Sequence, residues 1–247
     1  MFVFIEDSGQ SVPHHYSLRS FGSLWVDEAS LISLESEILK LRIRYTCWGE
    51  IKWQNVDHNH AELYKEVLNI FHNTPGAKFN SIICKAPTTE ELNLYHGGDD
   101  YREKMKLIYQ LVAYNYSGYR NSFCSGKTLK LIADEPFLQV GQHREDLLNN
   151  FTNPNYRSRY VPIESARKAH SHISGAMQMT DLLTGLSLVH CCKSIFPGDY
   201  SIGTTNQPLV DHALSLGLTL DPVFTGRPSP DTTKVNNWFH LPRGTSV

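Results

Sequence analysis

Two apolar segments, far apart in the chain, each run directly into acidic residues. Phe2–Ile5 (FVFI) leads into Glu6 and Asp7, and Lys127–Ala133 (KTLKLIA) leads into Asp134. Short runs of apolar, β-branched and aromatic residues indicate buried strands. The Ser-Gly pair after the first acids and the proline after the second are expected to end these strands. The chain is therefore predicted to fold around a sheet that presents carboxylates where its strands leave the core.

The rest of the chain mixes helix-like and strand-like segments. Apolar residues recur at helical spacing in some segments, and strand composition recurs in others. The expected helices are Glu28–Arg44, His60–Phe71, Tyr101–Tyr116 and His172–Cys192, and the further expected strands are Tyr16–Val26, as one strand or a hairpin of two, Ala77–Ala86 and Tyr156–Ile163. This order predicts an α/β fold, with a mixed central sheet flanked by helices and an irregular C-terminal extension.

Length and composition limit the number of domains and the kinds of protein that the chain could be. The 247 residues suit one large domain, expected at residues 1–205, with a C-terminal helix and an irregular tail at 206–247 packed on it. The net charge of −2 requires any nucleic-acid contact to come from a local basic cluster. The lack of a long apolar run and of a signal-peptide pattern predicts a cytoplasmic protein with no membrane partner. The five cysteines contain no C-x-x-C spacing, which argues against a disulfide framework.

Two more acidic residues stand where a charge needs a partner. Asp181 lies within GAMQMTDLLTGL, an otherwise apolar helix, and Glu50 lies where a helix gives way to a short segment. If Glu6 or Asp7 gathers with Glu50, Asp134 and Asp181, the like charges repel unless a divalent cation lies between them. All-oxygen ligands suit Mg²⁺ or Mn²⁺. Two such ions promote the hydrolysis of a phosphodiester.

Basic residues that could contact a phosphate backbone lie just before the helix of Asp181. Such a cluster would make nucleic-acid binding salt-dependent, and its histidines could move a proton near neutral pH. The cluster consists of Arg157, Arg159, Arg167, Lys168, His170 and His172. Lys52 is expected either to contact the scissile phosphate or to pair with a carboxylate. The alternative for the whole cluster is a solvated surface loop.

Four motifs together resemble a family of bacterial and phage proteins called domain of unknown function 3800. They are Glu6-Asp-Ser-Gly9, Glu50-Ile-Lys-Trp53, Leu131-Ile-Ala-Asp134 and Gln178-x-x-Asp-Leu-Leu-x-Gly185, and the match extends over most of the chain up to Gly185. The resemblance implies a ribonuclease H-like fold and a metal-dependent phosphodiesterase with four acidic ligands. It also implies a role in defence against phage or mobile DNA.

The first motif departs from the family pattern, because the family usually has Asp before Glu and here Glu6 precedes Asp7. Glu6 reaches one methylene farther and could still be the ligand, or Asp7 could take its place. The inverted pair could also mark a lost active site. Two hypotheses follow: a nuclease of unresolved DNA or RNA preference, or an inactive module that binds nucleic acid or a partner protein. A homo-oligomer or a regulatory protein partner is compatible with both.

Overall fold

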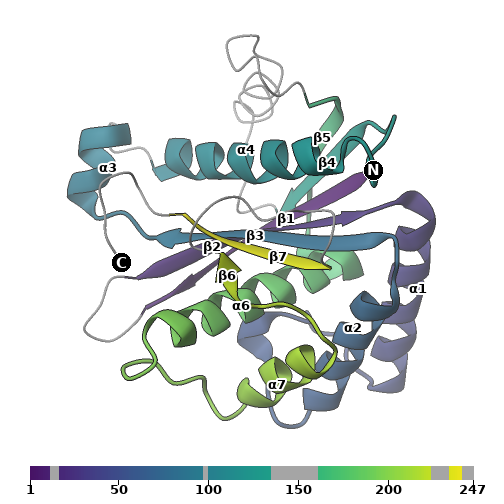
Figure 1. Cartoon of the computed structure of the whole chain (residues 1–247). Coiled ribbons are helices and arrows are strands. Elements are labelled where there is room, and N and C mark those ends of the chain that lie inside the picture. The colour runs from purple at the N-terminus through teal and green to yellow at the C-terminus, as the bar shows by residue number, and fades with distance from the viewer. Residues whose placement is uncertain (12–16, 97–99, 135–160, 224–233, 241–247) are drawn as a thin grey trace.

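A computed structural model describes residues 1–11, 17–96, 100–134, 161–223 and 234–240. A seven-stranded mixed sheet forms its centre, with strand order β5-β4-β1-β2-β3-β7-β6 (Figure 1). The strands are β1 (Phe2–Gln10), β2 (Leu18–Val26), β3 (Ala77–Lys85), β4 (Leu129–Asp134), β5 (Ile163–Ala169), β6 (Pro222–Val223) and β7 (Val235–His240). β1, β2 and β3 pair antiparallel, whereas every other neighbouring pair is parallel.

Helices cover both faces of this sheet. The helices are α1 (Glu28–Arg44), α2 (Ala61–Asn73), α3 (Thr89–His96), α4 (Asp100–Tyr119), α6 (Gly175–Ile195) and α7 (Gln207–Ser215), with short 3-10 turns η1 (Trp53–Asn55) and η4 (Ser171–Ile173). In Figure 1, α4 lies above the sheet, and α6 lies below it with α1, α2 and α7. The predicted mixed α/β architecture is confirmed.

The two faces of β1 bury two separate hydrophobic clusters. Phe4 belongs to the cluster around α6, whereas Val3 and Ile5 belong to the cluster around α4. This division follows from the alternation of side chains along a strand. α6 itself is apolar on nearly every side, because it packs on β1, β2 and β3 and is covered from the other side by α1 and α2.

Three sequence-based expectations need correction. β1 does not end at Ser8 and Gly9 but continues to Gln10, because antiparallel pairing with β2 satisfies its backbone up to the partner Leu18. The strand expected to close at Ile163 instead begins there, because β5 pairs in parallel with β4. Residues 235–240 form β7 beside β3, so this part of the C-terminal segment has regular structure that its sequence did not indicate.

None of the helices in the described ranges is long and apolar enough to cross a membrane.

Candidate active site

Glu6 and Asp134 come from neighbouring parallel strands, β1 and β4. The last pair in their ladder is Ile5 with Ala133, so the two acids are the next residue on each strand. Side chains alternate along a strand, so Glu6 shares a face with Phe4, and Asp134 shares one with Ile132. Phe4 and Ile132 both face the cluster around α6. The sheet therefore brings the two carboxylates together on the face that α6 covers.

Asp181 reaches the same place from α6. Its carboxylate interacts electrostatically with Asp134 and with Glu6. Burial raises the pKa of Asp181 to about 6, although the backbone N–H of Trp53, which donates to Oδ1 at 2.7 Å, acts in the opposite direction. The acid that interrupts the apolar helix thus faces other charged groups.

Two side chains of α6 hold the segment 50–53 over this acidic group. Gln178 accepts a hydrogen bond from the backbone N–H of Ile51 at 3.2 Å, and Asp181 accepts one from Trp53. The side-chain amide of Gln178 also donates to the carbonyl of Ser171 at 2.9 Å. Gln178 and Asp181 are three residues apart, so they lie on the same helix face. The Gln-x-x-Asp spacing therefore fixes the backbone that carries Glu50 and Lys52.

Glu50 and Lys52 form an ion pair at the open side of the group. The Lys52 ammonium lies 2.9 Å from one Glu50 oxygen, and the Ser171 hydroxyl donates to the other at 2.7 Å. Partial burial opposes ionisation of Glu50, but the hydrogen bonds from Ser171 and Lys52 hold its pKa below the ordinary value. Lys52 also interacts electrostatically with Asp134 and Asp181. Lys52 thus interacts with all four acids, since Glu6 also feels its charge.

Glu6 is the most deeply buried acid of the group. Its side chain is 4% exposed, and its Oε1 has no hydrogen-bond partner in the described part of the chain. Burial and the neighbouring carboxylates of Asp134 and Asp181 raise the pKa of Glu6 to about 10. A buried carboxyl oxygen without a donor costs free energy, so Glu6 lowers the free energy of unfolding of the protein.

Asp7 lies on the opposite face of the sheet. Side chains alternate along β1, so Asp7 shares its face with Val3 and Ile5. Lys104 of α4 lies 3.7 Å from the Asp7 carboxylate. The structure therefore brings Glu6, Glu50, Asp134 and Asp181 together and leaves Asp7 outside the group.

The structure describes only some of the basic residues that the sequence suggested as substrate contacts. Arg167 and Lys168 lie on β5, not in a loop, and pair in register with Ile132 and Ala133. Parallel partners point to the same face, so Arg167 lies on the Glu6 face and Lys168 on the other. Arg157 and Arg159 lie outside the described residues.

The two histidines follow β5 directly and approach Glu50. Their side chains are exposed, and the rings of His170 and His172 are 5.3 Å apart. His172 interacts electrostatically with Glu50, to which the intervening Ser171 donates. The carboxyl end of β5 thus places imidazoles beside the acidic group.

The donor set of Glu6, Glu50, Asp134 and Asp181 consists only of carboxylate oxygens, which Mg²⁺ and Mn²⁺ prefer. The unpartnered Oε1 of Glu6 is a further feature that a cation would satisfy. Within the described ranges, however, no three Asp, Glu, His or Cys side chains form a group that could hold an ion as they stand. The chemistry of the residues fits a divalent cation, but the carboxylates would have to close around it.

Sequence reasoning gave no role to Gln178 or Gly185, although both belong to a motif that it quoted. Gln178 is completely buried among apolar residues, which is a signal for a polar partner. A Cβ on Gly185 would lie 2.1 Å from Cγ of Trp53, so only glycine lets Trp53 pack this closely on α6. These residues position the site without contributing charge to it.

Comparisons with known proteins find only distant structural similarity. No protein-family model matches the chain, and no curated protein is similar to it in sequence. Ribonuclease HII of Archaeoglobus fulgidus, from its complex with PCNA, has a TM-score of 0.45 and 8% identity and covers 88% of each chain. A mutant of Bst ribonuclease HIII has a TM-score of 0.45 and 11% identity and covers 87% of this chain and 64% of its own. No residue role passes from them to this chain.

Because the pKa of Glu6 is raised, we expect the stability of the protein to fall as the pH rises. Between its ordinary pKa of 4.5 and the folded value of about 10, the folded protein keeps a proton that the unfolded chain releases. Glu6→Gln is expected to raise the melting temperature by roughly 5 °C or more at pH 8, and much less at pH 5. Differential scanning calorimetry at both values measures this without added metal.

The matched control is Glu37→Gln, which makes the same change on the exposed surface of α1. It is expected to leave the melting temperature nearly unchanged at either pH. A Glu6→Gln protein that is less stable than wild type at pH 8 would show that the Glu6 carboxylate is compensated.

Proposed function

We propose that this protein is a nuclease that hydrolyses nucleic-acid phosphodiesters with Mg²⁺ or Mn²⁺. The single observation that supports this most is the meeting of Glu6, Asp134 and Asp181 on one face of the sheet, with Glu50 beside them. Like charges at this depth are unfavourable by themselves. Chains rarely keep such an arrangement for stability, and perturbed carboxylates gathered in one place favour a functional site.

The four carboxylates are the proposed ligands, with Glu6 and not Asp7 as the first. Asp7 pairs with Lys104 on the other face of the sheet, although burial still raises the pKa of Asp7 above its ordinary value. Held by these carboxylates, two divalent cations would supply an activated water and would neutralise charge on the leaving oxygen. Glu6 would have to lose its proton to join them, so cation binding is expected to release protons.

The residues around the acids have complementary tasks in this proposal. Lys52 reaches the group from the segment held by Gln178 and would contact the scissile phosphate once released from Glu50. His172, exposed beside Glu50, would accept or donate a proton at the edge of the site. Arg167 and His170 would bind the flanking phosphates of the substrate.

We propose further that the chain belongs to the family called domain of unknown function 3800. The motifs around Glu6, Glu50, Asp134 and Asp181 support this assignment, and so does their order along the chain. Defence against phage or mobile DNA is the role that this assignment would imply.

Divalent cation binding is the experiment that tests the proposal. We expect isothermal titration calorimetry to detect Mn²⁺ binding to the wild type and a loss of at least about tenfold in affinity for Asp134→Asn. Asn keeps the size of the side chain, so the change removes charge rather than packing. Cleavage of mixed single- and double-stranded DNA and RNA then establishes which nucleic acid is the substrate.

Glu164→Gln provides the control, because Glu164 lies at the opposite end of β5, paired with Lys130 and Thr128. It is expected to bind Mn²⁺ as the wild type does. The nuclease proposal fails if the wild type binds neither Mn²⁺ nor Mg²⁺ in the presence of nucleic acid.

The second candidate is an inactive module that binds nucleic acid or a partner protein. The position of Lys52 favours it, because its ammonium already pairs with Glu50 and interacts with the other acids. In that case Lys52→Met would destabilise the protein, and nucleic-acid binding would persist without divalent cations. Cation-independent binding together with no cleavage would identify this alternative.

A further inference from the structure

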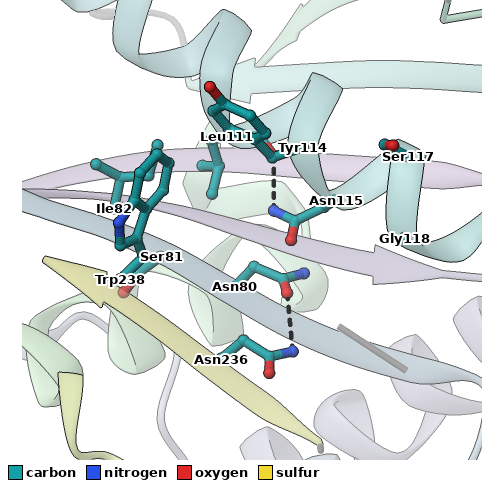
Figure 2. Close-up of a pocket in the computed structure, with 10 residues that line it drawn as sticks. All are labelled: Asn80, Ser81, Ile82, Leu111, Tyr114, Asn115, Ser117, Gly118, Asn236 and Trp238. Atoms are coloured by element: carbon teal, nitrogen blue, oxygen red, sulfur yellow. Dashed lines mark hydrogen bonds between the residues drawn. The ribbon is translucent and has the colours of Figure 1, made fainter. Parts of the chain in front are cut away.

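A cavity of about 190 Å³ lies on the other side of the sheet, between α4 and the strands β3 and β7 (Figure 2). Asn80 of β3, Asn115 of α4 and Asn236 of β7 line it together with Tyr114 and Trp238. The acidic group faces α6, so the sheet separates this cavity from the candidate active site. Among the residues that the structure describes, no charged side chain lines it.

Both hydrogen bonds of the Asn80 side chain are made by its amide oxygen. Its Oδ1 accepts from the Tyr119 hydroxyl at 2.9 Å and from Nδ2 of Asn236 at 3.1 Å. Its Nδ2 is buried and has no partner among the described residues. Asn80 therefore holds a donor whose hydrogen bonds are unused, and a buried donor without an acceptor costs free energy.

Asn115 has the reverse polarity. Its Nδ2 donates to the carbonyl of Leu111 at 2.6 Å, and a carbonyl can only accept, so the amide cannot be turned around. Oδ1 of Asn115 is thereby left to face the cavity, and Figure 2 shows it directed toward Asn80. A donor and an acceptor, both preorganised, thus meet in one cavity.

Aromatic rings form the remaining wall. Tyr114 and Trp238 pack edge to face, with their ring centroids 5.1 Å apart. Their fixed geometry offers flat apolar surface next to the two amides. The cavity far exceeds the roughly 10–15 Å³ that one water needs, but it is smaller than the roughly 300–1,000 Å³ of sites for drug-sized ligands.

We propose that this cavity binds a single neutral heterocyclic ring with adjacent N–H and C=O groups, as in a nucleobase such as uracil. The ring carbonyl accepts from Asn80 Nδ2, the ring N–H donates to Asn115 Oδ1, and the ring packs parallel to one of the two aromatic side chains and edge-on to the other. This ligand uses both unused groups and brings no charge into a neutral cavity. The site is independent of the acidic group and of the nuclease proposal.

Titration with uracil, followed by ¹H–¹⁵N NMR, tests the proposal. A single ring buries little surface, so we expect a dissociation constant on the order of 1 mM. The side-chain amide signals of Asn80 and Asn115 are expected to shift. The ligand control is 1,3-dimethyluracil, which keeps the ring and both carbonyls but has no N–H, and it is expected not to bind.

Asn115→Leu is the variant that removes the acceptor while keeping the size of the side chain. It is expected to weaken uracil binding by about tenfold or more. Asn115→Ala, which suits a helix, is a second variant in case the leucine disturbs folding. Asn73→Leu on the exposed last turn of α2 makes the same change away from the cavity and is expected to bind normally.

The results of these titrations can support or overturn the proposed ring-binding site. Binding that Asn115→Leu loses and Asp134→Asn keeps would establish a site separate from the acidic group. Equal binding of 1,3-dimethyluracil, or unchanged affinity in both Asn115 variants, would overturn the proposal. So would the absence of any shift at 10 mM uracil, roughly ten times the expected constant, because ordered water would then account for the polar lining.

Discussion

Asp181→Asn is expected to reduce metal-dependent cleavage by about 100-fold or more while the protein stays folded. The loss should exceed the 10–100-fold that follows removal of an outer-shell partner, because Asp181 is proposed to hold the cation itself. Asn keeps an oxygen that can accept from the Trp53 N–H, so the segment 50–53 stays in place. Burial raises the pKa of Asp181 to about 6, so removing its charge is expected to leave stability at pH 8 unchanged or slightly higher.

Initial cleavage rates with Mn²⁺, combined with melting temperatures of the same samples, measure both effects. Asp211→Asn, at an exposed position of α7, is the matched control and should cleave as the wild type does. Activity of Asp181→Asn within tenfold of the wild type would contradict a ligand role for this residue. A parallel loss of activity and stability would instead mean that Asp181 acts mainly by positioning Trp53.

Gly185→Ala is expected to destabilise the protein, although alanine normally stabilises a helix by roughly 1 kcal/mol relative to glycine. The added Cβ would lie 2.1 Å from Cγ of Trp53, far inside van der Waals contact. Overpacking of this kind costs about 1–3 kcal/mol. Since Trp53 is buried against the main core, we expect the melting temperature to fall by roughly 5–10 °C.

The same substitution at Gly198 is the control, because a Cβ there meets nothing within 4 Å. Thermal unfolding of both variants should show a decrease for Gly185→Ala only. A double variant that also carries Trp53→Val should recover part of the loss, since the two sites then no longer collide. A Gly185→Ala protein that is as stable as the wild type would mean that Trp53 can move away from α6 at little cost.

The predictions for Asp181→Asn and Gly185→Ala both concern the contact between α6 and Trp53. Gly185 and Asp181 are one helical turn apart on α6, so Trp53 packs on the glycine while its N–H reaches the acid. Moving Trp53 would also displace Lys52 and Glu50, which precede it. We therefore expect Gly185→Ala to weaken Mn²⁺ binding as well as stability.

Local sequence patterns predicted most of the secondary structure. The helix expected at Glu28–Arg44 and the strand expected near Ala77–Ala86 agree with α1 and β3. The patterns failed where pairing decides the outcome: β1 runs through Ser8 and Gly9 because β2 supplies its hydrogen bonds. β7 forms in a Pro- and Gly-containing region because the edge of β3 offers it a partner. The division at residues 205 and 206 stays a prediction.

Local composition already shows which residues carry charge in apolar surroundings. Glu6 and Asp134 follow apolar strand segments, and Asp181 interrupts an apolar helix, so each had to find a partner or a polar face. It could not choose between Glu6 and Asp7, because both faces of the first strand are apolar. That choice depends on which helix covers which face of the sheet.

The packing of helices on the sheet gives Glu6 and Asp7 different surroundings and brings Glu6, Glu50, Asp134 and Asp181 together. α6 covers the face of Glu6, and α4 places Lys104 beside Asp7, so neighbouring residues on one strand have opposite environments. The clamp of Gln178 and the close approach of Trp53 to Gly185 depend on residues more than 120 positions apart. Contacts at such separation leave no periodic pattern in the sequence, whereas the cost of burying a charge is visible in it residue by residue.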